Sequence, residues 1–340
     1  MNQAIQLETP LSPVPDLKLQ LAALLSHAAV APLTTTGWVR VTGDDRVRWL
    51  NGMVTNSIQD LAPGQGNYNF LLSAQGRIQG DAHIFAEPEA LLLESSLTQL
   101  PNLITLLDRF IIMDDVELTD ISATRTGLLI AGPEAATLLD QQGLNTTDLA
   151  PLQIKTFTWQ SAEVTLLHAE SPLVPRFELW ADPATITALT TALQQAGATP
   201  ITEAALEGLR ILEGTPLYGT DIRAKELPQE TAQTRALHFS KGCYLGQEIV
   251  ERIRSRGNVH RTFTAFRLEG ALPPVGTLLE AESKQIGELT SIASIELPNQ
   301  QVQLALGYVR REALDRNLTL TYPDGVAIPV SVPFPVVAAG

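Results

Sequence analysis

The sequence predicts an α+β protein of two or three domains, with a ferredoxin-like middle module and a small antiparallel β-barrel at its C-terminal end. Its 340 residues exceed the usual size of one domain, and 44% of them are hydrophobic, enough for a sizeable core. Helices alternate with strands between residues 126 and 202. After Arg261 helical periodicity almost disappears, and short strands are separated by Pro and Gly turns.

The first 125 residues predict a mixed layer of helices and strands. Residues 1–15 are polar and punctuated by proline, so we expect a loose arm there. An amphipathic helix is expected over 17–29, because apolar residues recur on one face from Leu17 to Ala28. Strands are expected at 38–42, 69–72, 78–85 and 90–94, with helices at 44–54 and 97–110.

The middle and last segments differ in pattern. The middle segment alternates helices and strands in a β-α-β-β-α-β order with one additional strand, which is typical of a ferredoxin-like module. Its expected strands are 126–130, 156–159, 164–168, 176–180 and 199–202, and its expected helices are 133–142 and 183–196. We expect the barrel to consist of strands at 262–268, 287–295, 302–308, 318–322 and 328–332.

Charge and composition exclude several classes of function. The chain has 23 Lys and Arg residues against 37 Asp and Glu, and its net charge of −14 disfavours broad binding to nucleic acid or an anionic membrane. No stretch approaches the roughly 20 apolar residues of a membrane span. The one cysteine, Cys243, excludes an internal disulfide and indicates a reducing compartment, so we expect a cytoplasmic protein. The histidines lack ligand spacing, so no metal site is expected.

The stretch from His238 to Gly257 carries the clearest chemical signal. Helical spacing over 244–254 places Cys243 near a helix N-terminus, where the macrodipole stabilises a thiolate. Lys241 lies two residues before the thiol. Cys243 is therefore a candidate reactive thiol, with Lys241 in an electrostatic role. The alternative is a buried cysteine that acts as a small hydrophobe.

A basic cluster follows the cysteine. Arg252, Arg254 and Arg256 stand at alternate positions, and Arg261 comes next. This alternation does not follow one helical face, so it favours a loop or strand that presents the guanidinium groups to an anion. The alternative is a solvated helix face.

Residues 241–248 read KGCYLGQE and resemble the K-G-C-Y-x-G-Q-E signature of the YgfZ family. This family comprises folate-binding relatives of the glycine-cleavage T-protein that support iron–sulfur enzyme maturation. Similarity to successive family motifs extends over nearly the whole chain: TGDD at 42–45, WLNGMVTN at 49–56, PG at 63–64, LLSAQGRI at 71–78 with Asp81, LR at 209–210 and LYGTD at 217–221.

The resemblance implies a T-protein-like arrangement of three domains around a central opening that holds a tetrahydrofolate. Residues 1–125 and 203–261 together would form an N-terminal α+β folate-binding domain. Residues 126–202 would form the ferredoxin-like domain, and residues 262–340 the barrel domain.

A folate presents a flat polar pterin and a glutamate tail, so its site needs an apolar slot, a few hydrogen-bonding groups and cations at its mouth. The resemblance implies hydrogen-bonding groups from Thr55, Asn56, Asp81 and Tyr218, and cations from Arg223 or the cluster around Arg254. Alternatively, Thr55 and Asn56 only turn the chain, and Asp81 is an exposed strand residue.

The other residues that we assign to the site belong to two motifs, KGCYLGQE at 241–248 and LR at 209–210. Gly242 and Gly246 are expected to allow close backbone approach. Gln247 and Glu248 fall one turn after Cys243, where Glu248 favours a helix start. The remaining two residues are Arg210 and Tyr244.

The chain departs from the aminomethyltransferase branch of these relatives. That branch resembles R-x-E-x-G where this chain has Arg210, Leu212, Glu213 and Gly214, so Leu212 replaces the pterin-binding carboxylate. The branch also lacks the cysteine of K-G-C-Y. Glycine cleavage is therefore the less expected activity, although Asp81 lies at or beside the catalytic aspartate of that branch.

The leading hypothesis is a tetrahydrofolate-binding accessory protein for assembly or repair of iron–sulfur clusters in client enzymes, with Cys243 as a redox-active or transiently ligating thiol. One alternative is a folate-dependent aminomethyltransferase that uses Asp81. Another is a tRNA-modification factor that acts through residues 252–261, which the net charge of −14 disfavours. We expect a monomer whose partners are iron–sulfur client or assembly proteins. Whether it is an enzyme is left open.

Overall fold

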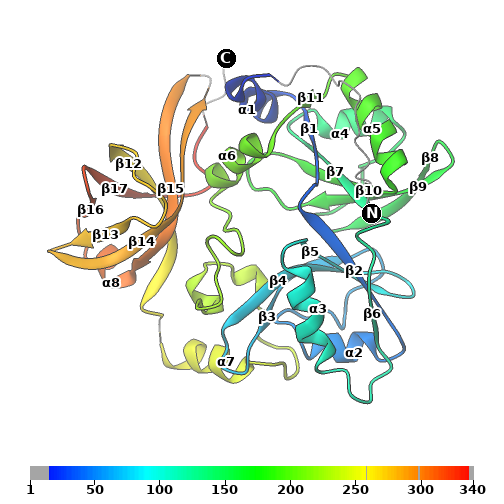
Figure 1. The fold of residues 1–340 in the computed structure, drawn as a ribbon, viewed down its shortest axis with the longest axis horizontal. Helices are drawn as coiled ribbons and strands as arrows, with labels where there is room; N and C mark the ends of the chain where they lie inside the picture. Colours follow the sequence, from blue (N-terminus) through cyan, green and yellow to red (C-terminus); the bar gives the residue numbers. More distant parts are fainter. Residues whose placement is uncertain (1–14, 258, 298, 337–340) are drawn as a thin grey trace, which may run out of the picture.

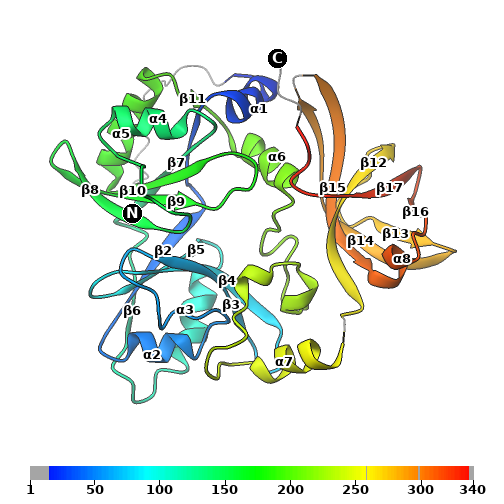
Figure 2. The same ribbon diagram turned by 180° about the vertical axis from the view of Figure 1, so that it is seen from behind.

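The computed structural model describes residues 15–257, 259–297 and 299–336. Two sheets and a closed barrel are arranged around a common centre (Figure 1). Seen from behind, the segment that follows α6 (Glu203–Glu213) still runs between the barrel and the first sheet (Figure 2). The expected arm lies mostly outside the described residues. Within those residues, no helix is long and apolar enough to cross a membrane.

The first sheet has five strands in the order β3-β4-β5-β2-β6. Their bounds are β2 Thr36–Thr42, β3 Gly66–Leu72, β4 Ile78–Ala86, β5 Leu91–Ser96 and β6 Glu117–Asp120. Helices α2 (Arg46–Asn51) and α3 (Leu100–Asp108) are shorter than expected, and their apolar side chains pack against one face of the sheet. The sequence did not predict β6, because its residues ELTD are polar and mostly exposed.

Helix α1 covers Leu17–Ser26, so the expectation of a helix through residue 29 was wrong. The chain leaves the helix at His27 and forms strand β1 (Ala29–Pro32). This strand lies in the second sheet, between β11 (Thr199–Pro200) and β7 (Thr126–Ala131). A segment from the start of the chain therefore completes the middle module.

The second sheet has the order β11-β1-β7-β10-β9-β8. Its other elements are α4 Ala135–Gln141, β8 Ile154–Trp159, β9 Ala162–Ala169, β10 Arg176–Ala181 and α5 Pro183–Gln195. Leu128 and Ile130 of β7 pack with both helices, whereas Leu129 and Ala131 face the centre of the molecule. This alternation follows from the period of two along a strand. Without β1 and β8, the chain retains the expected β-α-β-β-α-β order.

The last segment forms a closed antiparallel barrel of six strands, which confirms the predicted barrel. The strands are β12 Arg261–Gly270, β13 Leu278–Ala281, β14 Lys284–Leu297, β15 Gln300–Arg310, β16 Leu320–Tyr322 and β17 Gly325–Val330. The sequence did not predict β13 or the short helix α8 (Arg311–Asp315). In the closed barrel each strand pairs with two neighbours.

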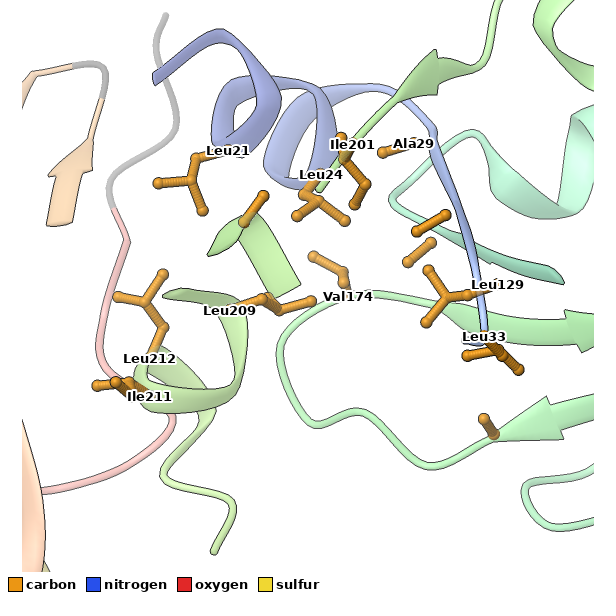
Figure 3. Close-up of a cluster of buried hydrophobic side chains, with 14 of the residues drawn as sticks. Leu21, Leu24, Ala29, Leu33, Leu129, Val174, Ile201, Leu209, Ile211 and Leu212 are labelled. Atoms are coloured by element: carbon orange, nitrogen blue, oxygen red, sulfur yellow. The ribbon is translucent and has the colours of Figure 1, made fainter. Parts of the chain in front are cut away.

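The largest hydrophobic core joins all three parts of the molecule. Figure 3 shows Leu21 and Leu24 of α1 close to Leu209 and Leu212 of α6. Leu304 and Leu306 of the barrel belong to the same core. The three parts are therefore held together by shared apolar packing, which fixes the space between them.

Candidate functional site

A cavity of about 980 Å³ lies where the three parts meet. Its lining includes Arg176 from the second sheet, Glu213 from α6, Arg235 from the segment after α6 and Phe263 from the barrel. Both apolar and charged side chains therefore border one space. Its size is within the range of small-molecule sites, which is roughly 300–1,000 Å³.

Asp81 lies on β4, on the side of the first sheet that faces the centre, and two side chains hold its carboxylate. The hydroxyl of Tyr68 donates a hydrogen bond of 2.6 Å to Oδ2, and the amide of Gln99 donates one of 2.8 Å to Oδ1. Asp81 is half-buried and is not a freely exposed strand residue. Tyr218 lies on a neighbouring segment, where its hydroxyl donates to the carbonyl oxygen of Gln79. Asp81 is thus an oriented acceptor that retains capacity for a ligand.

Arg235 joins this site to the cavity, and sequence reasoning missed it. It lies in the short 3-10 helix η2 (Thr234–Ala236), and its guanidinium carbon is 4.5 Å from the centre of the Tyr68 ring. It also forms an ion pair with Glu170, which follows β9. Arg235 and Glu170 line the cavity, whereas Tyr68 and Asp81 do not.

Two buried acids, Glu94 on β5 and Glu178 on β10, were also missed. The first sheet contributes one and the second sheet the other. Burial raises the pKa of Glu94 to about 7 and also raises the pKa of Glu178. Arg176 lies 2.8 Å from Glu178, and Trp180 donates to the same carboxyl group. The available signal was a glutamate inside each of two apolar strands, LLLESS and RFELWA.

His83 lies beside the Glu94 carboxyl group on the neighbouring strand, with 3.4 Å between Nδ1 and Oε2. Burial lowers the pKa of His83 to about 4, so the ring is neutral at physiological pH. The polar side chains between the two sheets, His83, Glu94 and Glu178, therefore carry little positive charge. The nearest fixed cations are Arg176 and Arg235, at the wall of the cavity.

Lys241 is turned toward the chain after α2. Its Nζ donates hydrogen bonds to the carbonyl oxygens of Asn51, Val54 and Asn56, at 2.7, 2.8 and 2.6 Å. An ammonium group has three N–H donors, so none remains for Cys243. Burial lowers the pKa of Lys241 to about 7. Lys241 therefore holds this backbone segment, and its electrostatic effect on the thiol stays a prediction.

Cys243 is exposed, so the alternative of a buried small hydrophobe is wrong. Helix α7 covers Gln247–Arg256 and begins four residues after Cys243, not beside it. The helix starts late because Gly246 has φ of +83°, a left-handed conformation. Cys243 therefore does not lie at the helix N-terminus, which corrects the expectation that the helix dipole stabilises its thiolate.

Among the described residues, no three His, Cys, Asp or Glu side chains gather as a metal site.

The two motif glycines differ. A Cβ atom on Gly246 would lie 2.5 Å from the carbonyl oxygen of Ser73, so close approach requires glycine there. A Cβ on Gly242 would meet nothing within 4 Å, so the expectation of close approach was wrong at that position. The Cys243 loop is open on the side of Gly242.

Thr55 and Asn56 bind backbone. The Thr55 hydroxyl donates to the carbonyl oxygen of Ala236 at 2.6 Å, and the Asn56 amide donates to that of Arg235 at 2.9 Å. The backbone N–H of His238 returns a hydrogen bond to Thr55. Together with the hydrogen bonds of Lys241, these contacts join the segment WLNGMVTN to the distant stretch from Arg235 to Lys241. Both side chains thus hold this segment to the distant stretch at η2, and their contact with a ligand stays a prediction.

Arg210, a residue assigned to the site, and Arg223, an expected cation, are both occupied by protein partners. Arg210 donates to Asp221 and to Ser291 of the barrel, both at 2.7 Å, and therefore ties α6 to β14. Arg223 forms a two-pronged ion pair with Glu288. Arg210 lines the cavity but Arg223 does not.

Arg252, Arg254 and Arg256 lie on α7, so the expected loop or strand was wrong there and the helical alternative holds, whereas Arg261 begins β12. The Arg254 guanidinium lies 4.5 Å from the Phe239 ring centre and 3.5 Å from Glu251. Gln247 and the exposed Glu248 form the first turn of the helix. Tyr244 is buried just before it, which raises its pKa to about 12. None of these residues lines the cavity.

Comparison with known proteins agrees with this architecture. Residues 17–241 match the family model of the GCVT N-terminal domain. The chain belongs to this GCVT domain family. Residues 261–336 match the C-terminal β-barrel domain of CAF17, so the chain has the GCVT domain and barrel of the YgfZ/CAF17 architecture.

Relatives of this GCVT protein include enzymes. A chloroplastic protein of Arabidopsis thaliana that is named as a transferase is 25% identical over 317 residues, covering 92% of this chain and 73% of the relative. The aminomethyltransferase of Geobacillus kaustophilus is 26% identical, covering 86% of this chain and 82% of the relative. The crystal structure of glycine cleavage system aminomethyltransferase T from Bartonella henselae has a TM-score of 0.83 at 20% identity, covering 95% and 90% of the two chains. The GCVT fold is therefore shared along nearly the whole chain.

Proposed function

We propose that this GCVT-family protein binds a tetrahydrofolate in its central cavity and supports the assembly or repair of iron–sulfur clusters in client enzymes through Cys243. The observation that carries the proposal is the exposed thiol of Cys243 in a loop whose Lys241 side chain is fixed to three carbonyl oxygens. A thiol for transient chemistry with a partner must be both accessible and held in place.

The chemistry of the cavity supports the folate part of the proposal. Leu206 and Phe263 supply apolar wall, and Arg176 supplies positive charge. The Nε atom of Arg176 is buried and, within the described part of the chain, has no hydrogen-bond partner. Buried donors are nearly always satisfied, so this atom is free for an acceptor on a ligand. The residues present therefore fit a flat polar group with an anionic tail.

The decisive experiment measures client-enzyme activity in a strain that lacks the gene. Complementation with the wild-type gene should restore the iron–sulfur enzymes, whereas Cys243→Ala should not. Ser240→Ala, in the same exposed loop, is the matched control and should restore them. Restoration by Cys243→Ala would overturn the proposed role of the thiol. Calorimetry with 5-formyltetrahydrofolate tests the folate part separately.

A second candidate is a folate-dependent aminomethyltransferase that uses Asp81. It is favoured by the two donors that fix the Asp81 carboxylate and by relatives that are named aminomethyltransferases. In contrast, Leu212 is fully buried in the shared core, so this position offers no group to a ligand. Transfer of a one-carbon unit from a lipoylated carrier protein, abolished by Asp81→Asn, would establish this activity.

A tRNA-modification factor is the third candidate. Arg252 and Arg254 are exposed on α7, which is its only specific support. A gel shift with tRNA whose strength falls steeply with salt would favour it.

We further propose a cytoplasmic monomer, which size-exclusion chromatography and cell fractionation can check.

A further inference from the structure

Arg235 occupies the position from which a flat ligand would reach Tyr68. The Tyr68 ring is buried, with Phe70 and His83 beside it at 5.4 and 5.1 Å between ring centres. The Arg235 guanidinium covers the ring at 4.5 Å. Because Arg235 lines the cavity and Tyr68 does not, the guanidinium separates the ring from the cavity.

Three contacts hold the Arg235 side chain there. Its Nε donates to Gln233 at 3.0 Å, its Nη1 pairs with Glu170, and its guanidinium carbon lies over the Tyr68 ring. Glu170 belongs to the second sheet's β9–β10 connection, whereas Gln233 is adjacent to η2. The side chain therefore bridges two parts of the molecule across the cavity wall.

These contacts keep the Arg235 guanidinium over Tyr68, but a ligand can break them. The side chains of Arg235 and Glu170 are 36% and 32% exposed, and ion pairs open to solvent contribute little. A flat heterocycle that stacks on Tyr68 would replace the guanidinium with a ring that has a larger contact area. The hydroxyl of Tyr68 would then remain bonded to Asp81, directly beside the ligand.

We propose that Arg235 is an internal latch, which Glu170 holds over Tyr68 and which a flat ligand must displace to reach the Tyr68–Asp81 pair. This inference rests on the proposed folate function for the identity of the ligand. The latch itself is a property of the free protein. It makes ligand entry depend on one ion pair between two domains.

Binding kinetics provide the first test. Association of 5-formyltetrahydrofolate is followed by tryptophan fluorescence in the full chain. Glu170→Gln and Arg235→Gln should each raise the association rate by about two- to fivefold, the range that a partly exposed ion pair allows. Glu87→Gln is the matched control, because Glu87 pairs with Arg40 at 4.0 Å and neither residue lines the cavity. Weaker binding by Arg235→Gln would overturn the latch, because it would make Arg235 a cation that binds the ligand.

Nuclear magnetic resonance of the arginine Nε–Hε groups provides a test that needs no ligand. The Arg235 signal, assigned by its loss in Arg235→Gln, should show the upfield displacement caused by the Tyr68 ring. Glu170→Gln should reduce this displacement, and Glu87→Gln should not. An undisplaced Arg235 signal in the free wild type would overturn the latch. If no folate binds any variant, the proposed function fails, while the displacement in the free protein still decides whether the latch exists.

Discussion

The Nζ atom of Lys241 lies 2.6 Å from the carbonyl oxygen of Asn56, which joins the KGCYLGQE loop to the segment after α2. The same atom also binds the carbonyl oxygens of Asn51 and Val54. One side chain thus satisfies three acceptors on a chain segment that lies nearly 190 residues away in sequence. The position of the Cys243 loop depends on this cluster of hydrogen bonds.

Replacing Lys241 with Met should destabilise the protein and loosen the loop. The change leaves three partly buried carbonyl oxygens without their donor, and we expect the free energy of unfolding to fall by about 2–3 kcal/mol. Urea denaturation measures this change. Lys225→Met is the control, because Lys225 is 58% exposed and lies 3.7 Å from Glu288. Equal stability of the two variants would contradict a clamping role for Lys241.

Glu94 should make stability fall as pH rises toward neutrality. Its folded-state pKa of about 7 is above its ordinary value of 4.5, so the folded state binds more protons between these values. The resulting stabilisation is present below pH 4.5 and is lost as pH rises through 7. Glu94→Gln should flatten this dependence and be more stable than wild type at pH 8, by about 1–3 kcal/mol. Chemical denaturation at several pH values measures it, with the exposed Glu163→Gln as control. An unchanged slope in Glu94→Gln would show that other groups cause the dependence.

Alanine should destabilise the protein at Gly246 but not at Gly242. Gly246→Ala forces a left-handed conformation on alanine and places its Cβ against Ser73, so we expect a loss of about 1–3 kcal/mol. Gly242→Ala adds a methyl group into open space and should change stability by less than about 0.5 kcal/mol. Thermal unfolding compares the two. Tolerance of alanine at Gly246 would mean that α7 can start in another conformation.

Cys243 should react with iodoacetamide in the native protein, because its side chain is exposed. Cys243→Ala should leave the free energy of unfolding within about 0.5 kcal/mol of wild type, since an exposed side chain contributes little packing. Mass spectrometry follows the alkylation in the absence and presence of denaturant. Modification only after denaturation would show that the loop is closed in solution.

The sequence predicted those helices and strands whose buried residues recur at a regular spacing. Alternation along 78–85 predicted β4, and the lack of helical periodicity after Arg261 predicted the barrel. The same method extended α1 through Ala29, because the apolar pattern continues across His27 into a strand. Periodicity shows which residues are buried, but it did not separate α1 from β1, because the buried residues of the helix and the strand follow each other closely in the chain.

The candidate site was harder to predict, because its contacts join residues far apart in sequence. Asp81 was found through a family resemblance, but its partners Tyr68 and Gln99 carry no motif that links them to it. The pairing of Arg235 with Glu170 depends on how two domains meet. Cys243 was expected beside a helix N-terminus, but α7 begins four residues later because Gly246 adopts a left-handed conformation.

Strand β1 sets a condition on the order in which the chain can fold during synthesis. Val30 pairs with Ile130 on one side and with Pro200 on the other, so its partners leave the ribosome long after it does. The first sheet, from Thr36 to Asp120, is complete before either partner exists. A nascent chain must therefore keep an apolar strand unpaired while the sheet after it forms, and non-local pairing of this kind is slow. The stretch Ala29–Pro32 therefore completes its strand pairing only after Pro200 has been synthesised.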